Sequence, residues 1–222
     1  MALSGPRRPA ASGKADALVV FLHGYGADGN DLMGLAEPLA ELLPDAAFAA
    51  PNAPHACPGA RFQWFAIAEL NPEVMHKGVV AAAPELAAYL EAELQRLALP
   101  ASRLALVGFS QGTMLALHLG LGPLKPAAIV GFSGVLTGEP PPSADFPPVF
   151  LSHGGADPLI PPEALFLTAG ALGAAGVRVQ WHLSPGIGHG IDETGLSGAA
   201  NFLQLALAGR LAADGEPHSL LR

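Results

Sequence analysis

Residues 104–112 read LALVGFSQG, and this stretch decides the fold. The aliphatic run 104–107 has the composition of a buried strand, and the apolar run 113–119 that follows has that of a helix. Between them, Ser110 lies on a turn flanked by two glycines. A strand-to-helix turn of this kind exposes a serine Oγ at the end of a sheet, and the glycines let neighbouring backbone approach closely. The stretch therefore predicts a nucleophile elbow.

Two later segments place a polar residue in the loop that follows a strand. Residues 149–153 have strand character and lead into a loop with Asp157, and residues 177–183 lead into a glycine-rich loop with His189. Open α/β sheets carry their chemistry at the carboxyl ends of strands. The chain order Ser110, Asp157, His189 is the one expected of α/β-hydrolases, and other serine hydrolase folds order their triads differently.

An earlier segment fits an oxyanion hole. The apolar run 18–22 predicts a strand, and the glycine-rich turn 23–29 after it can present a free backbone N–H group to a developing oxyanion. The second N–H group comes from Gln111, the residue after the nucleophile, as the elbow geometry requires. Four pieces in this order favour a serine hydrolase over a small polar residue in a glycine-rich loop.

Other histidines and acids compete for these roles. His23 precedes the nucleophile in the chain and His153 ends a strand, so both are interpreted as structural residues. Asp192 is the alternative triad acid because it follows His189 closely. A residue on the same loop is poorly placed to reach Nδ1 from behind, so Asp157 is favoured.

The blocks 23–29, 108–112, 153–158 and 188–190 resemble those of the small carboxylesterase, phospholipase and acyl-protein thioesterase family of α/β-hydrolases. The similarity spans about residues 17 to 207. The resemblance implies that Ser110 is the nucleophile, that His189 is the general base and then the general acid, and that Asp157 orients the imidazole. It also implies that the amides of Tyr25 and Gln111 form the oxyanion hole.

The resemblance further implies an acyl pocket near Trp64, in the segment FQWFAI at 62–67. Phe65 and Leu159 are further candidate substrate-binding residues, because their side chains can converge with Trp64 and Tyr25 to shape the pocket. This chain departs from the family pattern in two places. Tyr25 stands where members commonly carry leucine, and Ala66 stands where they carry aspartate. The first change leaves the backbone N–H group in place, so it affects substrate preference rather than the chemistry.

Alternating short apolar runs and longer amphipathic runs predict an α/β fold with a mostly parallel sheet, helices on both faces and a minimal lid. We expect a single domain over residues 17–210, a flexible tail at 1–16 and a C-terminal tail at 211–222. As a candidate lid over the pocket, the segment 68–77 is short and has no regular pattern of apolar residues. The expected strands lie near 17–22, 46–50, 103–109, 127–132, 148–153 and 177–183, and the expected helices near 30–43, 78–98, 111–121, 161–175 and 193–208.

Composition limits the remaining function classes. The net charge is -8, and no basic cluster occurs beyond residues 7–8, which argues against nucleic-acid binding. A single cysteine, Cys57, excludes an intramolecular disulfide and fits a reducing, cytoplasmic location. No histidine pair with metal-binding spacing and no Cys/His set occurs, so we expect no metal and no cofactor. The uncharged stretch 104–124 has membrane-spanning length, but its polar residues, glycines and proline favour a strand, an elbow and a helix over stable membrane insertion.

The expected activity is hydrolysis of small-molecule carboxylic esters with short or medium acyl chains, since no long apolar insertion is visible. The resemblance adds thioesters and lysophospholipids as substrates, and a homodimer as an oligomeric state. Three alternatives stay open: an amide hydrolase using the same triad, a non-catalytic binding module on a hydrolase fold, and a membrane-surface lipase.

Overall fold

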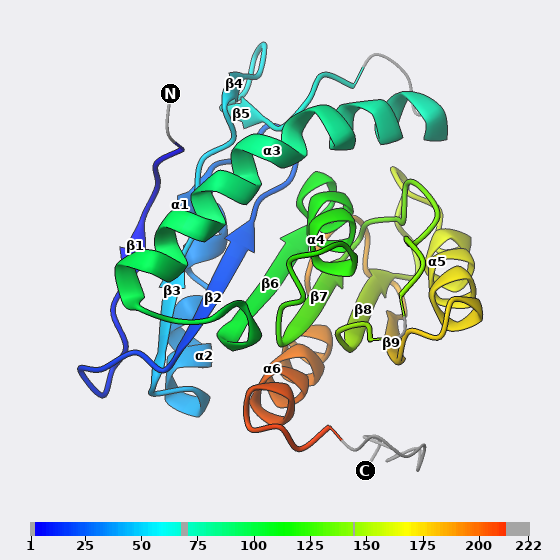
Figure 1. Ribbon diagram of the computed structural model, residues 1–222. Helices are drawn as coiled ribbons and strands as arrows, with labels where there is room; N and C mark the ends of the chain where they lie inside the picture. The colour runs from blue at the N-terminus through cyan, green and yellow to red at the C-terminus, as the bar shows by residue number, and fades with distance from the viewer. Residues whose placement is uncertain (1–2, 68–70, 144, 212–222) are drawn as a thin grey trace.

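The computed structural model describes residues 3–67, 71–143 and 145–211. Within these residues, seven strands form one sheet in the order β1-β3-β2-β6-β7-β8-β9 (Figure 1). All neighbouring strands are parallel except β1, which pairs antiparallel with β3 at one edge. The strands are β1 (Arg7–Arg8), β2 (Ala17–Leu22), β3 (Ala46–Ala49), β6 (Leu104–Phe109), β7 (Ala128–Phe132), β8 (Val149–Gly154) and β9 (Val179–Ser184).

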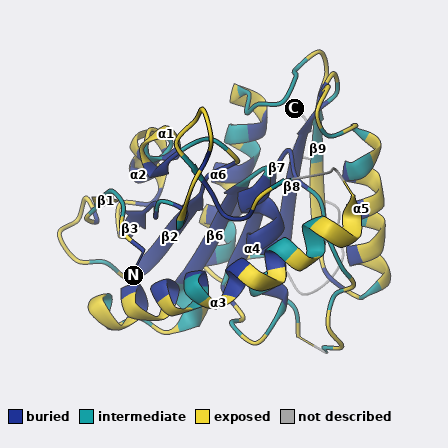
Figure 2. Ribbon diagram, turned by 90° about the horizontal axis from the view of Figure 1, so that it is seen from above, coloured by how far each residue is buried: buried dark blue, intermediate teal, exposed yellow. Residues whose placement is uncertain are grey.

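Helices cover both faces of the sheet, as predicted. In the view from above, α3, α4 and α5 lie on one side of the buried strands, and α1, α2 and α6 lie on the other (Figure 2). The helices are α1 (Gly29–Met33), α2 (Ala36–Leu42), α3 (Pro72–Leu97), α4 (Gln111–Leu121), α5 (Glu163–Ala174) and α6 (Glu193–Leu207). A short hairpin of β4 (His55–Ala56) and β5 (Phe62–Gln63) and a 3₁₀ turn at Ala101–Arg103 complete the described elements. None of the described helices combines the length and apolar composition needed to cross a bilayer.

The core consists of two layers separated by the sheet. Along β2, Leu18, Val20 and Leu22 pack into the layer beneath α3, α4 and α5, whereas Val19 and Phe21 pack into the layer beneath α1, α2 and α6. Every residue of β2 is buried. A parallel strand covered on both faces is apolar throughout rather than alternating, which is why β2 and β6 could be predicted as short continuous apolar runs.

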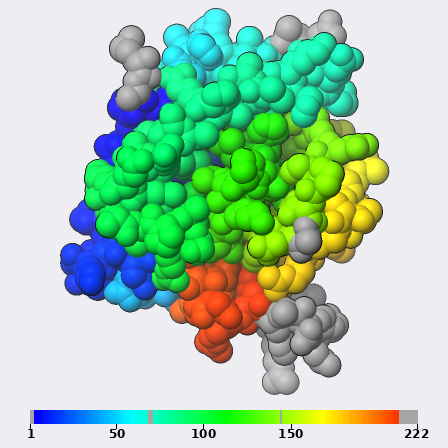
Figure 3. All heavy atoms as spheres, viewed as in Figure 1, coloured from blue at the N-terminus to red at the C-terminus, as the bar shows by residue number. Residues whose placement is uncertain are grey.

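Two helices differ from the prediction. The helix expected near 30–43 is interrupted at residues 34–35 and forms α1 and α2. The helix expected near 78–98 begins earlier, because Asn71 caps it: the Asn71 side chain accepts hydrogen bonds from Glu73 N (2.9 Å) and Val74 N (3.4 Å), and Pro72 occupies the first helical position. The start of α3 thus includes most of the segment that was interpreted as an unpatterned lid, of which residues 68–70 lie outside the described part. Figure 3 shows α3 crossing this face of the molecule from end to end.

The N-terminal segment also differs from the expected flexible tail. Arg7 and Arg8 form β1, and the Arg7 guanidinium contacts the buried carboxylate of Glu93 on α3 with an Nη2–Oε1 distance of 2.6 Å. Arg96 pairs with the same carboxylate. Burial opposes ionisation of Glu93, but hydrogen bonds from the two guanidinium groups outweigh it and lower its pKa. Long-range pairing orders this segment, and a local sequence pattern does not reveal such pairing. Of the expected C-terminal tail, residues 212–222 lie outside the described residues.

Candidate active site

Ser110 lies between β6 and α4 in a strained backbone conformation. Its φ and ψ are 55° and -114°, a region that residues with a side chain rarely adopt. The Ser110 N–H donates to Phe132 O on the neighbouring strand at 2.9 Å. A Cβ built on Gly112 would lie 1.8 Å from Leu22 O, so only glycine allows α4 to begin this close to β2. These features are those of the elbow that the sequence predicts.

The loop after β8 places Asp157 against His189. Asp157 Oδ2 lies 2.7 Å from His189 Nδ1, and Oδ1 accepts hydrogen bonds from Leu159 N (2.8 Å) and Ile160 N (3.0 Å). The Asp157 side chain is fully buried. Burial raises the pKa of this carboxyl, but the Ile160 N–H, the His189 imidazole and the Leu159 N–H together lower it below the ordinary value. An ionised Asp157 can accept a hydrogen bond from the Nδ1–H group of a neutral His189, whose unprotonated Nε2 can then act as a base.

His189 approaches the elbow through an aromatic contact. The Phe109 ring, adjacent to Ser110 in the chain, packs on the imidazole with centroids 5.0 Å apart and planes inclined at 54°. Among the described residues, the hydrogen bonds do not include one between Ser110 Oγ and His189. Catalytic hydrogen bonds of this kind are often long without substrate and tighten when it binds.

The two amides expected to form an oxyanion hole lie on segments that meet at Ser110. A Cβ built on Gly24 would lie 3.2 Å from Ser110 Cβ, so the turn that carries Tyr25 packs directly on Ser110. Gln111 is the first residue of α4, where a helix leaves its N–H groups without an acceptor. In the described part of the chain, no oxygen accepts a hydrogen bond from Tyr25 N either. Within the described residues, the N–H groups of Tyr25 and Gln111 are therefore donors without an acceptor, on two segments that meet at Ser110.

The expected substrate-binding residues have different environments. Trp64 and Phe65 are buried, with 1% and 7% of their surface exposed, whereas Leu159 is 57% exposed. Trp64 Nε1 donates to His23 O at 2.9 Å. The Gln111 side chain accepts from Trp64 N at 3.1 Å and donates to Phe65 O at 2.8 Å. Trp64 and Phe65 thus connect the turn after β2 to the start of α4.

The competing acid and histidines also have clear positions. Asp192 caps α6, where its Oδ1 accepts from Ser184 Oγ (2.6 Å) and Gly195 N (3.0 Å). Asp157, and not Asp192, is therefore the carboxylate that contacts His189. His153 is buried, and its Nε2 lies 3.3 Å from Asp157 Oδ2. Sequence reasoning missed this contact, because it depends on the turn after β8 in which Asp157 N donates to Gly154 O at 3.2 Å.

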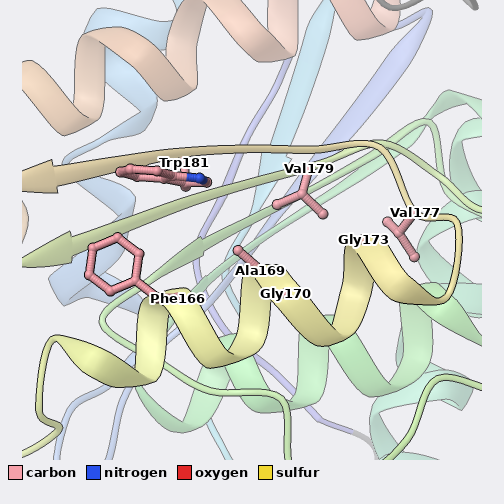
Figure 4. A pocket seen from close by; sticks show the side chains of 7 residues that line it. All are labelled: Phe166, Ala169, Gly170, Gly173, Val177, Val179 and Trp181. Atoms are coloured by element: carbon pink, nitrogen blue, oxygen red, sulfur yellow. The ribbon is translucent and has the colours of Figure 1, made fainter.

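Two cavities lie outside this cluster. One, of about 330 Å³, runs between α5 and β9, with the Phe166 and Trp181 rings at one end and Val177 at the other (Figure 4). None of its lining residues is titratable. A second cavity of about 310 Å³ lies alongside α4, and its lining includes His76, His118 and Met114. Met114 is four residues after Ser110 on α4. Among the described residues, no group of three His, Cys, Asp or Glu side chains is arranged to hold a metal ion.

Several known proteins resemble this chain in sequence and in fold. A family model described as Phospholipase/Carboxylesterase matches residues 9–207. Acyl-protein thioesterase 1 of Yarrowia lipolytica is 30% identical over 213 residues, covering 85% of this chain and 91% of that protein. Esterase YpfH of Escherichia coli is 26% identical over 196 residues, covering 87% and 84%. Among solved structures, esterase PE8 has a TM-score of 0.85 at 38% identity, covering 92% of this chain and 99% of that chain.

Proposed function

Because this chain belongs to the phospholipase/carboxylesterase family of α/β-hydrolases, it is a hydrolase of esters or thioesters, and we propose that Ser110, His189 and Asp157 are its catalytic triad. The observation that carries the proposal is the 2.7 Å contact between His189 Nδ1 and the buried Asp157 carboxylate, beside a serine with positive φ. Perturbed carboxylates and strained backbone concentrate at active sites.

In the first half of the reaction, Ser110 Oγ attacks the acyl carbonyl carbon while His189 Nε2 takes the hydroxyl proton. Asp157 holds the imidazole in the Nδ1–H tautomer and stabilises the imidazolium that forms. The carbonyl oxygen becomes an oxyanion between the N–H groups of Tyr25 and Gln111. In comparable sites, the loss of one such donor costs about 3–4 kcal/mol of transition-state stabilisation.

The intermediate then collapses. The bond from the acyl carbon to the leaving oxygen or sulfur breaks, His189 returns its proton to the leaving alcohol or thiol, and Ser110 keeps the acyl group as an ester. In the second half, His189 removes a proton from water, which attacks the acyl-enzyme and releases the carboxylic acid. Ser110 recovers its proton, so the enzyme is unchanged.

The substrates proposed are carboxylic esters with short or medium acyl chains, because the sequence carries no long apolar insertion above the site. Thioesters are the second candidate, since a relative that is 30% identical is named an acyl-protein thioesterase. Turnover of matched oxygen esters and thioesters of C2 to C16 acids separates the two. A matched anilide series tests the amide hydrolase.

The test of the triad is mass spectrometry after treatment with a fluorophosphonate. We expect one adduct, on Ser110, in the wild-type protein and none in Ser110→Ala or His189→Ala. His55→Ala changes an exposed histidine remote in sequence from the triad and serves as the control that keeps the adduct. A wild-type protein that folds and forms no serine adduct overturns the proposal in favour of a binding module.

A further inference from the structure

His23, directly after β2, is fully buried and its tautomer follows from its two partners. Its Nε2 accepts a hydrogen bond from Ala53 N at 2.9 Å. A backbone N–H can only donate, so Nε2 carries no proton. The proton of the neutral ring is therefore on Nδ1, which donates to Gly24 O at 2.7 Å. Burial lowers the pKa of His23, against the opposing effects of the Gly24 carbonyl, Asp28 and Asp31, and this keeps the ring neutral.

The bond to Gly24 O fixes the orientation of the next amide. Gly24 C=O and Tyr25 N–H belong to one peptide unit, which is trans, so they point in opposite directions. When His23 Nδ1 holds the carbonyl on one side, the Tyr25 N–H points to the other. Gly24 packs on Ser110 and on the Phe109 ring, so this peptide unit lies next to the proposed nucleophile.

We propose that His23 is a positioning residue of the oxyanion hole, whose Nδ1–H keeps the Gly24–Tyr25 peptide turned so that Tyr25 N–H faces the reacting carbonyl oxygen. This inference rests on the proposed function. Without the bond, the peptide unit can rotate and present Gly24 O to the substrate. A carbonyl dipole in that orientation repels the oxyanion that the N–H group would stabilise.

A second set of contacts fixes the spacing of the two donors. Trp64 Nε1 binds the carbonyl of His23, and the Trp64 ring lies 5.4 Å from the imidazole between centroids. The Gln111 side chain binds the backbone of both Trp64 and Phe65. A continuous series of buried hydrogen bonds therefore links the turn that carries Tyr25 to Gln111, which supplies the second N–H group. Fully satisfied networks of this kind hold their members rigidly.

Two substitutions separate the two bonds of His23. His23→Asn places an amide nitrogen where Nδ1 stood and retains the donor to Gly24 O. His23→Gln places its carbonyl oxygen near the Nε2 position and retains only the acceptor for Ala53 N. Both variants are measured for kcat and KM on a nitrophenyl ester, and for the Ki of a trifluoromethyl ketone, which forms an oxyanion on the serine.

We expect His23→Gln to lower kcat about 10- to 100-fold, to leave KM within about threefold, and to weaken the ketone by the same factor as kcat. His23→Asn keeps kcat within about fivefold of the wild type. Equal losses in the two variants, or a loss confined to KM, overturn the proposal. If neither variant folds, Trp64→Phe decides: parallel losses in kcat and ketone affinity support it, and unchanged values overturn it.

The proposed function is tested in the same experiment. If the wild-type protein turns over the ester and Ser110→Ala does not, the proposed triad is supported. This result does not depend on the activity of the His23 variants. If that holds and His23→Asn and His23→Gln lose activity equally, only the role of His23 is wrong. If wild-type protein neither hydrolyses the ester nor binds the ketone, the proposed function fails and the role of His23 fails with it.

Discussion

His153 Nε2 lies 3.3 Å from Asp157 Oδ2, on the same oxygen that faces His189. The same nitrogen lies 2.9 Å from Ile160 O, which can only accept, so Nε2 carries the proton. His153 therefore donates toward both the carboxylate and the backbone of the loop that follows it. The Asp157 carboxylate is surrounded by two backbone N–H groups and two imidazoles, which leaves it one orientation.

From this contact we expect His153→Leu to lower kcat roughly tenfold. Without His153 the Asp157 carboxylate can rotate, and a loss of about 1.4 kcal/mol of transition-state stabilisation lowers a rate tenfold. His153→Gln, which keeps a donor at the position of Nε2, is expected to recover most of the loss. The measurement is kcat on a nitrophenyl ester beside the unfolding midpoint of each variant. Equal kcat values in the two variants would mean that His153 only fills space.

The triad members are expected to act as a unit. Ser110→Ala, His189→Ala and the double variant should share nearly the same residual rate, at least about 10⁴-fold below the wild type, because each one removes the same step. Single-turnover and steady-state rates on an activated ester check this. If the two losses multiply in the double variant, the shared mechanism is wrong.

Asp157→Asn is expected to lower kcat roughly 10⁴-fold while leaving the fold intact, since an amide favours the wrong imidazole tautomer. Asp192→Asn is the matched control on the other acid near His189. Asparagine keeps a side-chain oxygen that can cap α6 about as well as aspartate, so this variant should lose little stability and change kcat less than tenfold. A larger loss in Asp192→Asn than in Asp157→Asn would reassign the triad acid.

The same carboxylate predicts an acid-dependent loss of stability. The pKa of Asp157 is lower in the folded protein than in the unfolded chain, where it is about 3.9. The contribution of Asp157 to the free energy of unfolding is therefore present above about pH 3.9. It disappears as the pH falls through the pKa that Asp157 has in the folded protein. The difference in unfolding free energy between wild type and Asp157→Asn should therefore narrow as the pH falls below about 4. Urea unfolding at several pH values measures it, and a constant difference contradicts the assignment.

Two helical glycines are expected to respond in opposite ways to alanine. At Gly112, the added Cβ meets Leu22 O, and the cost should be about 3 kcal/mol or more, or the loss of folding. At Gly170 on α5, no atom outside the adjoining backbone of the helix lies within 4 Å of the added Cβ, and alanine should stabilise the protein by roughly 0.5–1 kcal/mol. Thermal unfolding of the pair tests both directions. A destabilised Gly170→Ala would mean that the outer face of α5 is not free.

Much of the fold could be predicted because parallel strands buried on both faces are apolar throughout. The expected helix at 111–121 coincides with α4, and the strand expected near 17–22 coincides with β2. The candidate residues Ser110, Asp157 and His189 could be named because each one follows a strand, and the ends of parallel strands meet at one edge of a sheet.

What could not be predicted depends on contacts between distant parts of the chain. The pairing of Arg7 with Glu93 joins residues 86 positions apart, and nothing in a polar N-terminal segment indicates it. The role of the Gln111 side chain is similar, because its partners at Trp64 and Phe65 belong to another loop. The local periodicity of a sequence identifies its helices and strands. It does not identify side chains such as those of Arg7 and Gln111, which join one segment to another that is distant in the chain.

The register of the sheet has a consequence for refolding. Leu22 pairs with Gly108, Phe109 with Phe132, and Gly154 with Ser184, and each pair lies just before a segment of the candidate site. These pairings close long stretches of chain and form slowly, whereas helices form from local contacts within microseconds. After dilution from denaturant, the rate at which turnover recovers should therefore report when the sheet is complete. This recovery should be slower than the return of the helical circular dichroism signal.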